Sequence, residues 1–301
     1  MSDTTGSLSR KISSAGDLQS VVRTMKALAA SSIGQYEKSV IALGDYYHTV
    51  ELGLSAHFRE SNLQSRPAIE YRDTSEIDAV VFGSDQGLVG QFNDLIADYA
   101  VETLAALPGK PAVWAVGERV HARLTDSGVV PVGLFPVPNS VQAITPLVGQ
   151  IQLKSAAYRA GDGQAQLYLF HNRPKSGPLF EPVSQRLLPL DRAWREGLAR
   201  LPWPTATLPE ILGGGATTVA ATTVAALIRE YLFISLFRAC AESLASENAS
   251  RLAAMQRADT NIAELLETLR RDYHRLRQSG IDEELFDVIS GYEALGKGDN
   301  R

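Results

Sequence analysis

Cysteine is almost absent from this sequence of 301 residues, which contains only Cys240. One thiol excludes an internal disulfide and a cysteine-based zinc site, favours a reducing compartment, and is most simply a small buried apolar residue. No window approaches the roughly 20 apolar residues of a membrane span, and the N-terminal stretch lacks the apolar core of a signal peptide. The formal net charge of −5 is unlike the basic surface that broad nucleic-acid binding requires. We therefore expect a soluble protein of a bacterial cytoplasm that binds no nucleic acid.

Motifs for catalysis and metal binding are also missing. The five histidines, at positions 48, 57, 121, 171 and 274, show no metal-site spacing. Ser84 lacks the flanking glycines of a nucleophile elbow. The turn from Gly83 to Gln91 contains three glycines but forms neither a dinucleotide fingerprint nor a P-loop, and Asp85 would repel a phosphate. We expect a tight strand-to-helix turn there, with no cofactor and no metal; nucleotide binding is the alternative.

The longest stretch without proline or glycine runs from Thr217 to Gln278, so nothing in it interrupts a helix. Its apolar residues fall on one stripe, as in the seam of a coiled coil. They are Leu252, Met255, Ile262, Leu266, Leu269, Tyr273 and Leu276. At 1.5 Å per residue such a helix would span on the order of 90 Å, so it needs a partner to bury the stripe.

A matching stripe lies at the other end of the chain, where apolar residues step by three and four from Leu8 to about Leu54. They are Leu8, Ile12, Ala15, Leu18, Val22, Met25, Ala29, Ile33, Tyr36, Val40, Leu43, Tyr47, Val50 and Leu54. Four glycines weaken this helix by about 1 kcal/mol each relative to alanine. We expect it to be stabilised by packing against the C-terminal helix.

Between the two stripes, short apolar runs replace the helical spacing. We expect strands at 77–83, 111–116, 129–135 and 164–170, an edge strand at 185–190, and helices at 94–107, 118–127 and 140–159. This alternation predicts a doubly wound parallel sheet. Residues 61–76 have the composition of a linker, and Gly213–Gly215 form a swivel before a helix capped by Thr217 or Thr218.

Polar residues interrupt the C-terminal stripe. Asn248 and Asp259 either fix the register of the seam or face a partner. Ser279–Leu285 indicates a break in the helix, with Asp282 as a fresh N-cap. The many arginines of the two helices form either a solvated flank or contacts with acidic surfaces of partner subunits.

Four segments resemble motifs of one family. Met25–Ser31 (MKALAAS) is similar to the N-terminal signature of the gamma subunit of F-type rotary ATP synthases, and Ala245–Met255 (ASENASRLAAM) to its C-terminal signature. Tyr273–Gly291 resembles the last segment of that family, and Ser84–Leu88 (SDQGL) its strand-to-helix turn. The likeness extends along the whole chain in order, and the two terminal motifs are specific.

The resemblance implies a fold class and a function. The fold is α/β, with a long antiparallel coiled coil of the N- and C-terminal helices and an inserted Rossmann-like parallel-sheet domain. By this expectation residues 1–60 and 213–301 form the coiled-coil shaft, and residues 61–212 the inserted domain. The function is that of the central-stalk rotor, a non-catalytic subunit that couples ion flow through the membrane c-ring to ATP synthesis or hydrolysis. The implied partners are the alpha and beta subunits, the epsilon subunit and the c-ring, at the cytoplasmic side of the bacterial inner membrane.

The resemblance also implies residues that contact partners. Met25 matches the family methionine near the beta-subunit lever, with Lys26 beside it in the signature, and Arg251 matches an arginine that faces this methionine across the coil. Arg277 and Gln278 match a pair that meets a loop of the catalytic ring. Acidic contacts are expected nearby, at Asp282 and Glu284.

Some residues depart from the family pattern. Gln86 stands where arginine is usual, Gln91 where glycine is usual, and Gly280 and Asp282 where alanine and threonine are common. These departures indicate a divergent or alternate copy, of a proton- or sodium-pumping complex. Two other functions stay open from the residues themselves: a Rossmann-type nucleotide-binding enzyme, and a free-standing coiled-coil adaptor with an α/β head.

Overall fold

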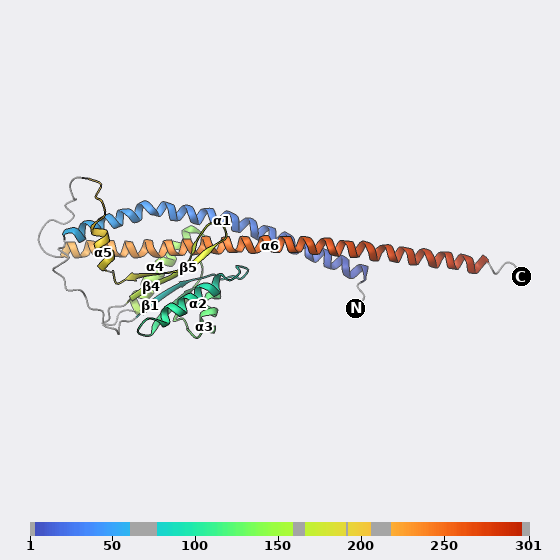
Figure 1. Cartoon of the computed structure of the whole chain (residues 1–301), viewed down its shortest axis with the longest axis horizontal. Coiled ribbons are helices and arrows are strands. Elements are labelled where there is room, and N and C mark those ends of the chain that lie inside the picture. Colours follow the sequence, from blue (N-terminus) through green and yellow to red (C-terminus); the bar gives the residue numbers. More distant parts are fainter. Residues whose placement is uncertain (1–3, 61–76, 159–165, 191, 206–217, 297–301) are drawn as a thin grey trace. The chain divides into compact units, whose positions relative to one another are not determined.

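The computed structural model describes residues 4–60, 77–158, 166–190, 192–205 and 218–296. The chain divides into two units: unit 1 comprises residues 1–28 and 252–301, and unit 2 residues 29–251. Helices α1 (Thr5–Glu60) and α6 (Thr218–Gly296) contribute to both units (Figure 1). The expected linker 61–76, the swivel at Gly213–Gly215 and the cap at Thr217 lie outside the described residues, as does the side chain of Thr218. The expected domain boundaries, which fall at the same places, stay predictions.

Unit 2 is built on a five-stranded sheet with the order β3-β2-β1-β4-β5. Its strands are β1 (Ile77–Phe82), β2 (Pro111–Val116), β3 (Gly133–Phe135), β4 (Gln166–Pro174) and β5 (Phe180–Leu188). The first four are parallel, and β5 pairs antiparallel with β4 at one edge. In register, Ile77 lies opposite both Pro111 and Gln166. The parallel sheet and its edge strand are thus confirmed, and β3 is shorter than expected.

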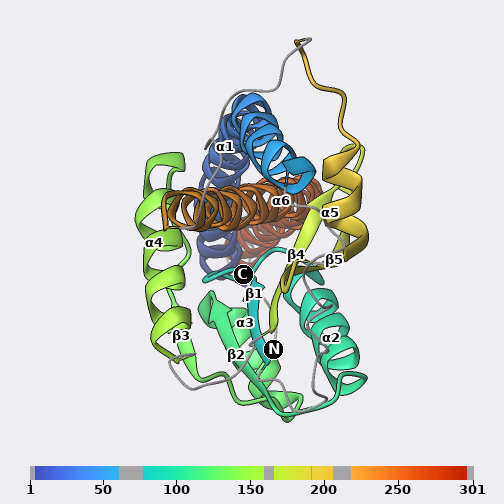
Figure 2. The ribbon, with the colours of Figure 1, turned by 90° about the vertical axis from the view of Figure 1, so that its left-hand side faces the viewer.

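Alternate side chains of the strands enter two separate cores. Ala79 and Val81 point to one face, where they pack with helices α2 (Phe92–Ala105) and α3 (Glu118–Asp126). Val80 and Phe82 point to the other, where they pack with α4 (Val141–Tyr158), α1 and α6. Figure 2 shows α2 on one side of the sheet, with α4 and the two long helices on the other. Helices on both faces confirm the doubly wound arrangement.

In unit 2, α1 and α6 run antiparallel, because their contacts advance along one helix as they retreat along the other. Tyr46 donates a hydrogen bond to Glu230 at 2.8 Å, whereas a Cβ built on Gly53, farther along α1, would lie 3.1 Å from Leu227. The same segments form the largest core of the unit together with one sheet face. The sheet therefore shares the core of this face with the two long helices, whereas its opposite face forms a separate core with α2 and α3.

In unit 1, the seam between α1 and α6 has a heptad repeat. The buried residues Leu8, Ala15 and Val22 of α1 are spaced by seven. Ala15 and Val22 pack with Met255, Ile262 and Leu266 of α6, and Leu8 continues the same row of side chains. This confirms the expected apolar seam. Leu18 is a wrong prediction, since it is 55% exposed. The half-buried Gln19 takes its place, because position 19, not 18, continues the seven-residue spacing from Ile12.

The expected break at Ser279–Leu285 is also wrong. The helix α6 continues through this segment without interruption, and Asp282 is exposed within the helix rather than at its start. A lone glycine such as Gly280 costs about 1 kcal/mol in helix propensity but keeps its backbone hydrogen bonds. It therefore weakens the helix without ending it.

Replacement of Gly117 by alanine is expected to destabilise unit 2 by about 2–4 kcal/mol. Gly117 has φ +115°, and a Cβ there would lie 2.7 Å from the Ser84 carbonyl oxygen, so both backbone strain and a clash oppose the side chain. Gly128→Ala is the matched control, because φ is +87° but nothing lies within 4 Å. It should cost about 1 kcal/mol, from strain alone. Urea unfolding of both variants measures the difference, and equal losses would contradict the clash.

Candidate functional site: the closed edge of the sheet and the two long helices

Doubly wound sheets bind their ligands outside the carboxyl ends of the strands, where the strand order changes direction. In this sheet that place lies between β1 and β4, because β2 and β3 lie on one side of β1 and β4 lies on the other. Gly83, Ser84 and Asp85 come directly after β1 and form the turn that leads towards α2. The side chains and elements that occupy this edge decide whether the domain has room for a nucleotide.

The carboxylate of Asp85 accepts hydrogen bonds from the backbone beside the turn. Asp85 accepts hydrogen bonds from the backbone N–H of Glu118, the first residue of α3, at 3.0 Å, and of Val137 at 2.9 Å. Asn93 completes the turn, because its side chain accepts from the Ser84 N–H and donates to the Ser84 hydroxyl. A helix N-terminus commonly binds phosphate. Here the end of α3 already holds Asp85, so the geometry is that of a tight structural turn.

Helix α6 occupies the rest of the crevice. Ser246 donates to the carbonyl of Asn172 at 3.0 Å, and Ser250 donates to the carbonyl of Val89. Asn172, just beyond the part of β4 that pairs with β1, donates in turn to the Phe92 carbonyl. The long helix therefore lies where a cofactor lies in related folds, and its serines satisfy the backbone groups that a ligand would contact.

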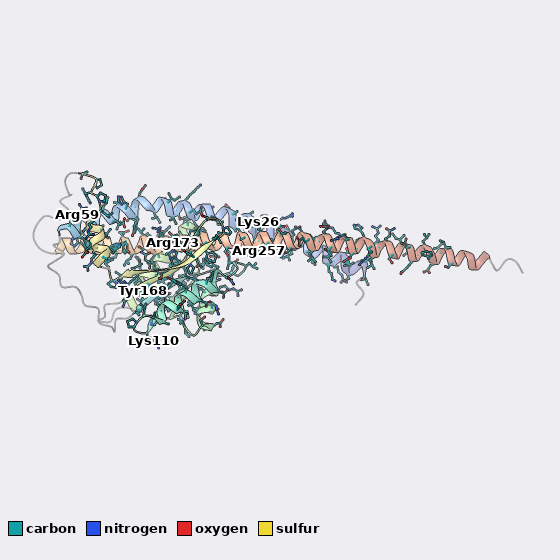
Figure 3. The ribbon with its side chains drawn as sticks, viewed as in Figure 1. Lys26, Arg59, Lys110, Tyr168, Arg173 and Arg257 are labelled. Atoms are coloured by element: carbon teal, nitrogen blue, oxygen red, sulfur yellow. The ribbon has the colours of Figure 1, made fainter. Side chains whose placement is uncertain are left out.

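A buried charged cluster ties β4 to α6 near the same edge. Glu242 accepts from Arg238 at 2.7 Å and contacts His171 Nε2 at 2.9 Å and Arg173 at 3.5 Å. Burial acts to raise the pKa of the Glu242 carboxyl, but hydrogen bonds and charge from His171 and Arg238 outweigh it and lower the pKa to about 2. The carboxylate is therefore charged at neutral pH. Figure 3 labels Arg173 where β4 runs along α6.

A second ion pair is internal to α6. Arg251 donates to Glu247 at 2.7 Å, and both side chains are nearly buried. Burial raises the pKa of Glu247, against the charge of Arg251. One Glu247 oxygen and the Arg251 Nε are buried without a hydrogen-bond partner in the described part of the chain. The predicted site residue Arg251 is thus already held by its own helix.

In unit 1, the polar interruption at Asp259 has partners on α1. Gln19, Arg23 and Lys26 reach its carboxylate at 3.0, 3.2 and 3.5 Å. Gln19 and Lys26 lie seven residues apart in the seam of α1. The polar residue Asp259 of α6 therefore meets polar residues of α1, and together they form a polar layer in the seam. The sequence left two roles open for Asp259, fixing the register of the seam or facing a partner. Its contacts with α1 favour the first. Met25, beside it, is half-buried against the apolar seam.

Replacement of Asp259 by asparagine is expected to loosen the seam of unit 1 and to remove its pH dependence. Partial burial acts to raise the pKa of Asp259, but Gln19 and Arg23 lower it below the ordinary value. The stabilisation is therefore present above the ordinary pKa and lost as the pH falls below it. Hydrogen exchange of the α1 amides around Gln19 should be faster in D259N at pH 7. Asp17→Asn, exposed on α1, is the control; equal exchange in both variants would contradict the role of Asp259.

The C-terminal part of α6 presents four predicted site residues, all exposed: Arg277, Gln278, Asp282 and Glu284. At 3.6 residues per turn they flank one helix face, with Arg277 and Glu284 on one side and Gln278 and Asp282 on the other. Between them lie exposed apolar side chains: Ile281, Leu285, Val288 and Ile289. We call this set, residues 277–289 on that face, the terminal face. It combines an apolar band with polar margins.

Sequence reasoning missed the residues that close the sheet edge. His171 appeared only as a scattered histidine, and Glu242, Ser246 and Ser250 carried no motif. Their partners are 71 to 161 positions away in sequence, so no local pattern signals them. Within the described residues, no group of histidine, cysteine and acidic side chains could hold a metal ion, and no helix is long and apolar enough to cross a membrane.

The comparisons with known proteins agree with this architecture. A family model described as ATP synthase, that of the gamma subunit of F-type ATP synthases, matches residues 4–295, nearly the whole chain. The chain belongs to the F-type ATP synthase gamma subunit family. It is accordingly a central-stalk rotor subunit, which bears out the main functional expectation.

Solved structures share the fold. A chain in the central stalk and c-ring of the Tetrahymena thermophila mitochondrial ATP synthase aligns with a TM-score of 0.56 at 19% identity, over 79% of this chain and 99% of that one. A chain in the rotor of the Euglena gracilis mitochondrial ATP synthase, in rotational state 1, aligns with 0.54 at 17% identity, over 91% and 97%. A second Euglena gracilis structure, of the OSCP, F1 and c-ring in rotational state 3, gives 0.52 at 17% identity, over 90% and 97%. At these identities the similarity shows the fold alone.

Proposed function

We propose that this chain turns inside a ring of alternating alpha and beta subunits and transmits ion flow through a c-ring to ATP synthesis or hydrolysis in that ring. Family membership supports the rotor role, and the residues of the terminal face are the ones that we propose to contact the ring. An apolar band that is exposed in the isolated chain needs either a partner or a surface on which to slide. Its polar margins, Arg277 with Glu284 and Gln278 with Asp282, supply contacts that change as the shaft turns.

Coupling in this proposal needs no chemistry on the shaft. Each catalytic site meets a different side of an asymmetric helix pair, so rotation changes the relative free energies of its conformational states. Met25 and Lys26 are proposed to face the beta-subunit lever. Arg251 is proposed to support that contact from α6, as the resemblance implies. Nucleotide chemistry belongs to the beta subunits.

We place the chain, as a peripheral subunit, at the cytoplasmic side of a bacterial inner membrane. There the inserted domain would contact the epsilon subunit and the c-ring. The absence of a spanning helix among the described residues is compatible with this placement. The sodium or pH dependence of ATP hydrolysis by the recovered complex distinguishes a sodium pump from a proton pump.

The alternative of a nucleotide-binding enzyme loses its support at the sheet edge. Asp85 occupies the N-terminus of α3, and α6 fills the adjoining crevice through Ser246 and Ser250. A nucleotide would have to displace both the carboxylate and the helix. Calorimetry of the isolated chain with ATP and with NAD tests this alternative, and we expect no appreciable heat of binding for either.

Affinity capture tests the proposal directly. Tagged full-length chain, expressed in its own cells, should recover alpha and beta subunits at one copy of the chain for three of each, together with epsilon and c subunits. Leu285→Asp with Val288→Asp should reduce this recovery, because two charges would enter the apolar band. Phe286→Asp, on the opposite side of the helix, is the matched control. Recovery of the chain alone, or with unrelated proteins, would support the adaptor alternative instead.

A further inference from the structure

A polar pocket of about 170 Å³ lies in unit 2 between α1, the β4–β5 pair and α6. Its lining consists of Tyr47, His171, Arg173, Gln185, Ser235, Arg238, Ala239 and Glu242. This volume is below the roughly 300 Å³ of pockets for larger organic ligands, yet well above the space that one water needs. The pocket therefore suits a small ligand with a few waters. The rotor function makes no use of it.

The charges in the lining favour an anion. Glu242 is already compensated, because one oxygen accepts from Arg238 and the other contacts His171 and Arg173. Both arginines use their Nε in these contacts and are about half-exposed, at 46% and 52% of their side chains. Within the described residues, their terminal nitrogens are free to donate to a further oxyanion, which is the geometry that guanidinium groups match best.

The surrounding polar groups are held in place. Gln185 and Ser235 both hydrogen-bond to Tyr231, and Tyr47 hydrogen-bonds to Glu51, which does not line the pocket. Burial raises the pKa of the Glu51 carboxyl above its ordinary value. The two arginines are thus the exposed charges of the lining.

His171 holds Glu242 from the β4 side of the pocket. Its Nε2 lies 2.9 Å from the Glu242 carboxylate, and because that carboxylate can only accept, Nε2 carries the proton. The ligand that suits the lining is therefore a small oxyanion with oxygens for the two arginines.

We propose that this pocket binds a small tetrahedral oxyanion such as inorganic phosphate. Phosphate offers oxygens to the terminal nitrogens of both Arg173 and Arg238. Sulfate has the same arrangement of oxygens, whereas chloride has none. Phosphate bound here would contact α1, the edge of the sheet and α6 together.

The test measures phosphate binding to the full-length chain by phosphorus NMR line broadening and by the shift in Tm. At matched ionic strength, phosphate and sulfate should both raise Tm, and chloride should not. Arg173→Gln should weaken phosphate binding by about tenfold or more, because a charged hydrogen bond is lost. Arg229→Gln, exposed on α6 outside the lining, should leave it unchanged. Circular dichroism verifies that each variant is folded.

Equal shifts with phosphate, sulfate and chloride, or undiminished phosphate binding in R173Q, would overturn the proposal. A carboxylate of a partner subunit is the competing occupant. This occupant would be indicated if the free chain did not bind phosphate while R173Q recovered fewer alpha and beta subunits. That outcome would also overturn the phosphate site. Because the binding measurement uses the chain alone, its failure leaves the rotor function untouched.

Discussion

Replacement of Glu242 by leucine is expected to destabilise unit 2 by about 3–5 kcal/mol, the usual cost of removing one partner of a buried ion pair. The loss leaves His171 and Arg238 without their common acceptor at the junction of β4 and α6. The lowered pKa gives a similar magnitude: the difference between the ordinary 4.5 and about 2 corresponds to roughly 3 kcal/mol. Urea unfolding at pH 7 measures this loss.

The pH dependence of this contribution has a definite sign. A carboxyl group with a lowered pKa in the folded state stabilises the fold fully above its ordinary pKa, and the contribution is lost as pH falls through the folded value. The difference in unfolding free energy between the native chain and Glu242→Gln should therefore shrink between about pH 5 and pH 2. Glu264→Gln, exposed on α6, is the control. A difference independent of pH would show that Glu242 does not stabilise the fold as a charged carboxylate.

Replacement of Met25 by lysine is expected to uncouple ion pumping from ATP hydrolysis. Met25 is half-buried beside Lys26 on α1, and lysine there would place a new charge at the proposed contact with the beta-subunit lever. A new charged hydrogen bond of about 1.5–3 kcal/mol would hold the rotor at particular angles and slow its release by about tenfold or more. Hydrolysis should continue while fewer ions are moved per ATP.

Met25→Leu controls for the loss of the methionine, because it keeps the volume and adds no charge. The measurement is the ratio of ion transport to ATP hydrolysis in membrane vesicles that contain each variant complex. An unchanged ratio in M25K would show that Met25 takes no part in the coupling contact, although the chain would still belong to the family.

The regular elements of this fold could be predicted because their signals are local. The stripe from Leu8 to Leu54 and the proline-free stretch after Thr217 each encode a helix that needs a partner. Short runs such as Ile77–Phe82 encode buried strands. Helix α5 (Arg192–Ala199) was not predicted, because its eight residues lie among prolines and are held by contacts of Arg59 with the carbonyls of Ala199 and Leu201.

The closed sheet edge could not be predicted in the same way. Ser250 and Val89 are 161 positions apart, and nothing in either segment indicates the other. Asp85 was interpreted only as a residue that would repel phosphate, whereas its carboxylate accepts a backbone N–H at the start of α3. The polar layer at Asp259 was visible as an interruption, but its partners Gln19 and Lys26 became recognisable only with the heptad register of α1.

Rotation of the chain inside the assembled complex is the most direct test of the account. Cys240 is buried and its thiol pKa is raised by burial, so a cysteine introduced at the exposed position Ala122 on α3 can carry a probe selectively. With the alpha and beta ring fixed to a surface, added ATP should turn the probe in one direction with three stopping positions per turn. A probe that stays still while the ring hydrolyses ATP at its full rate would contradict the rotor function.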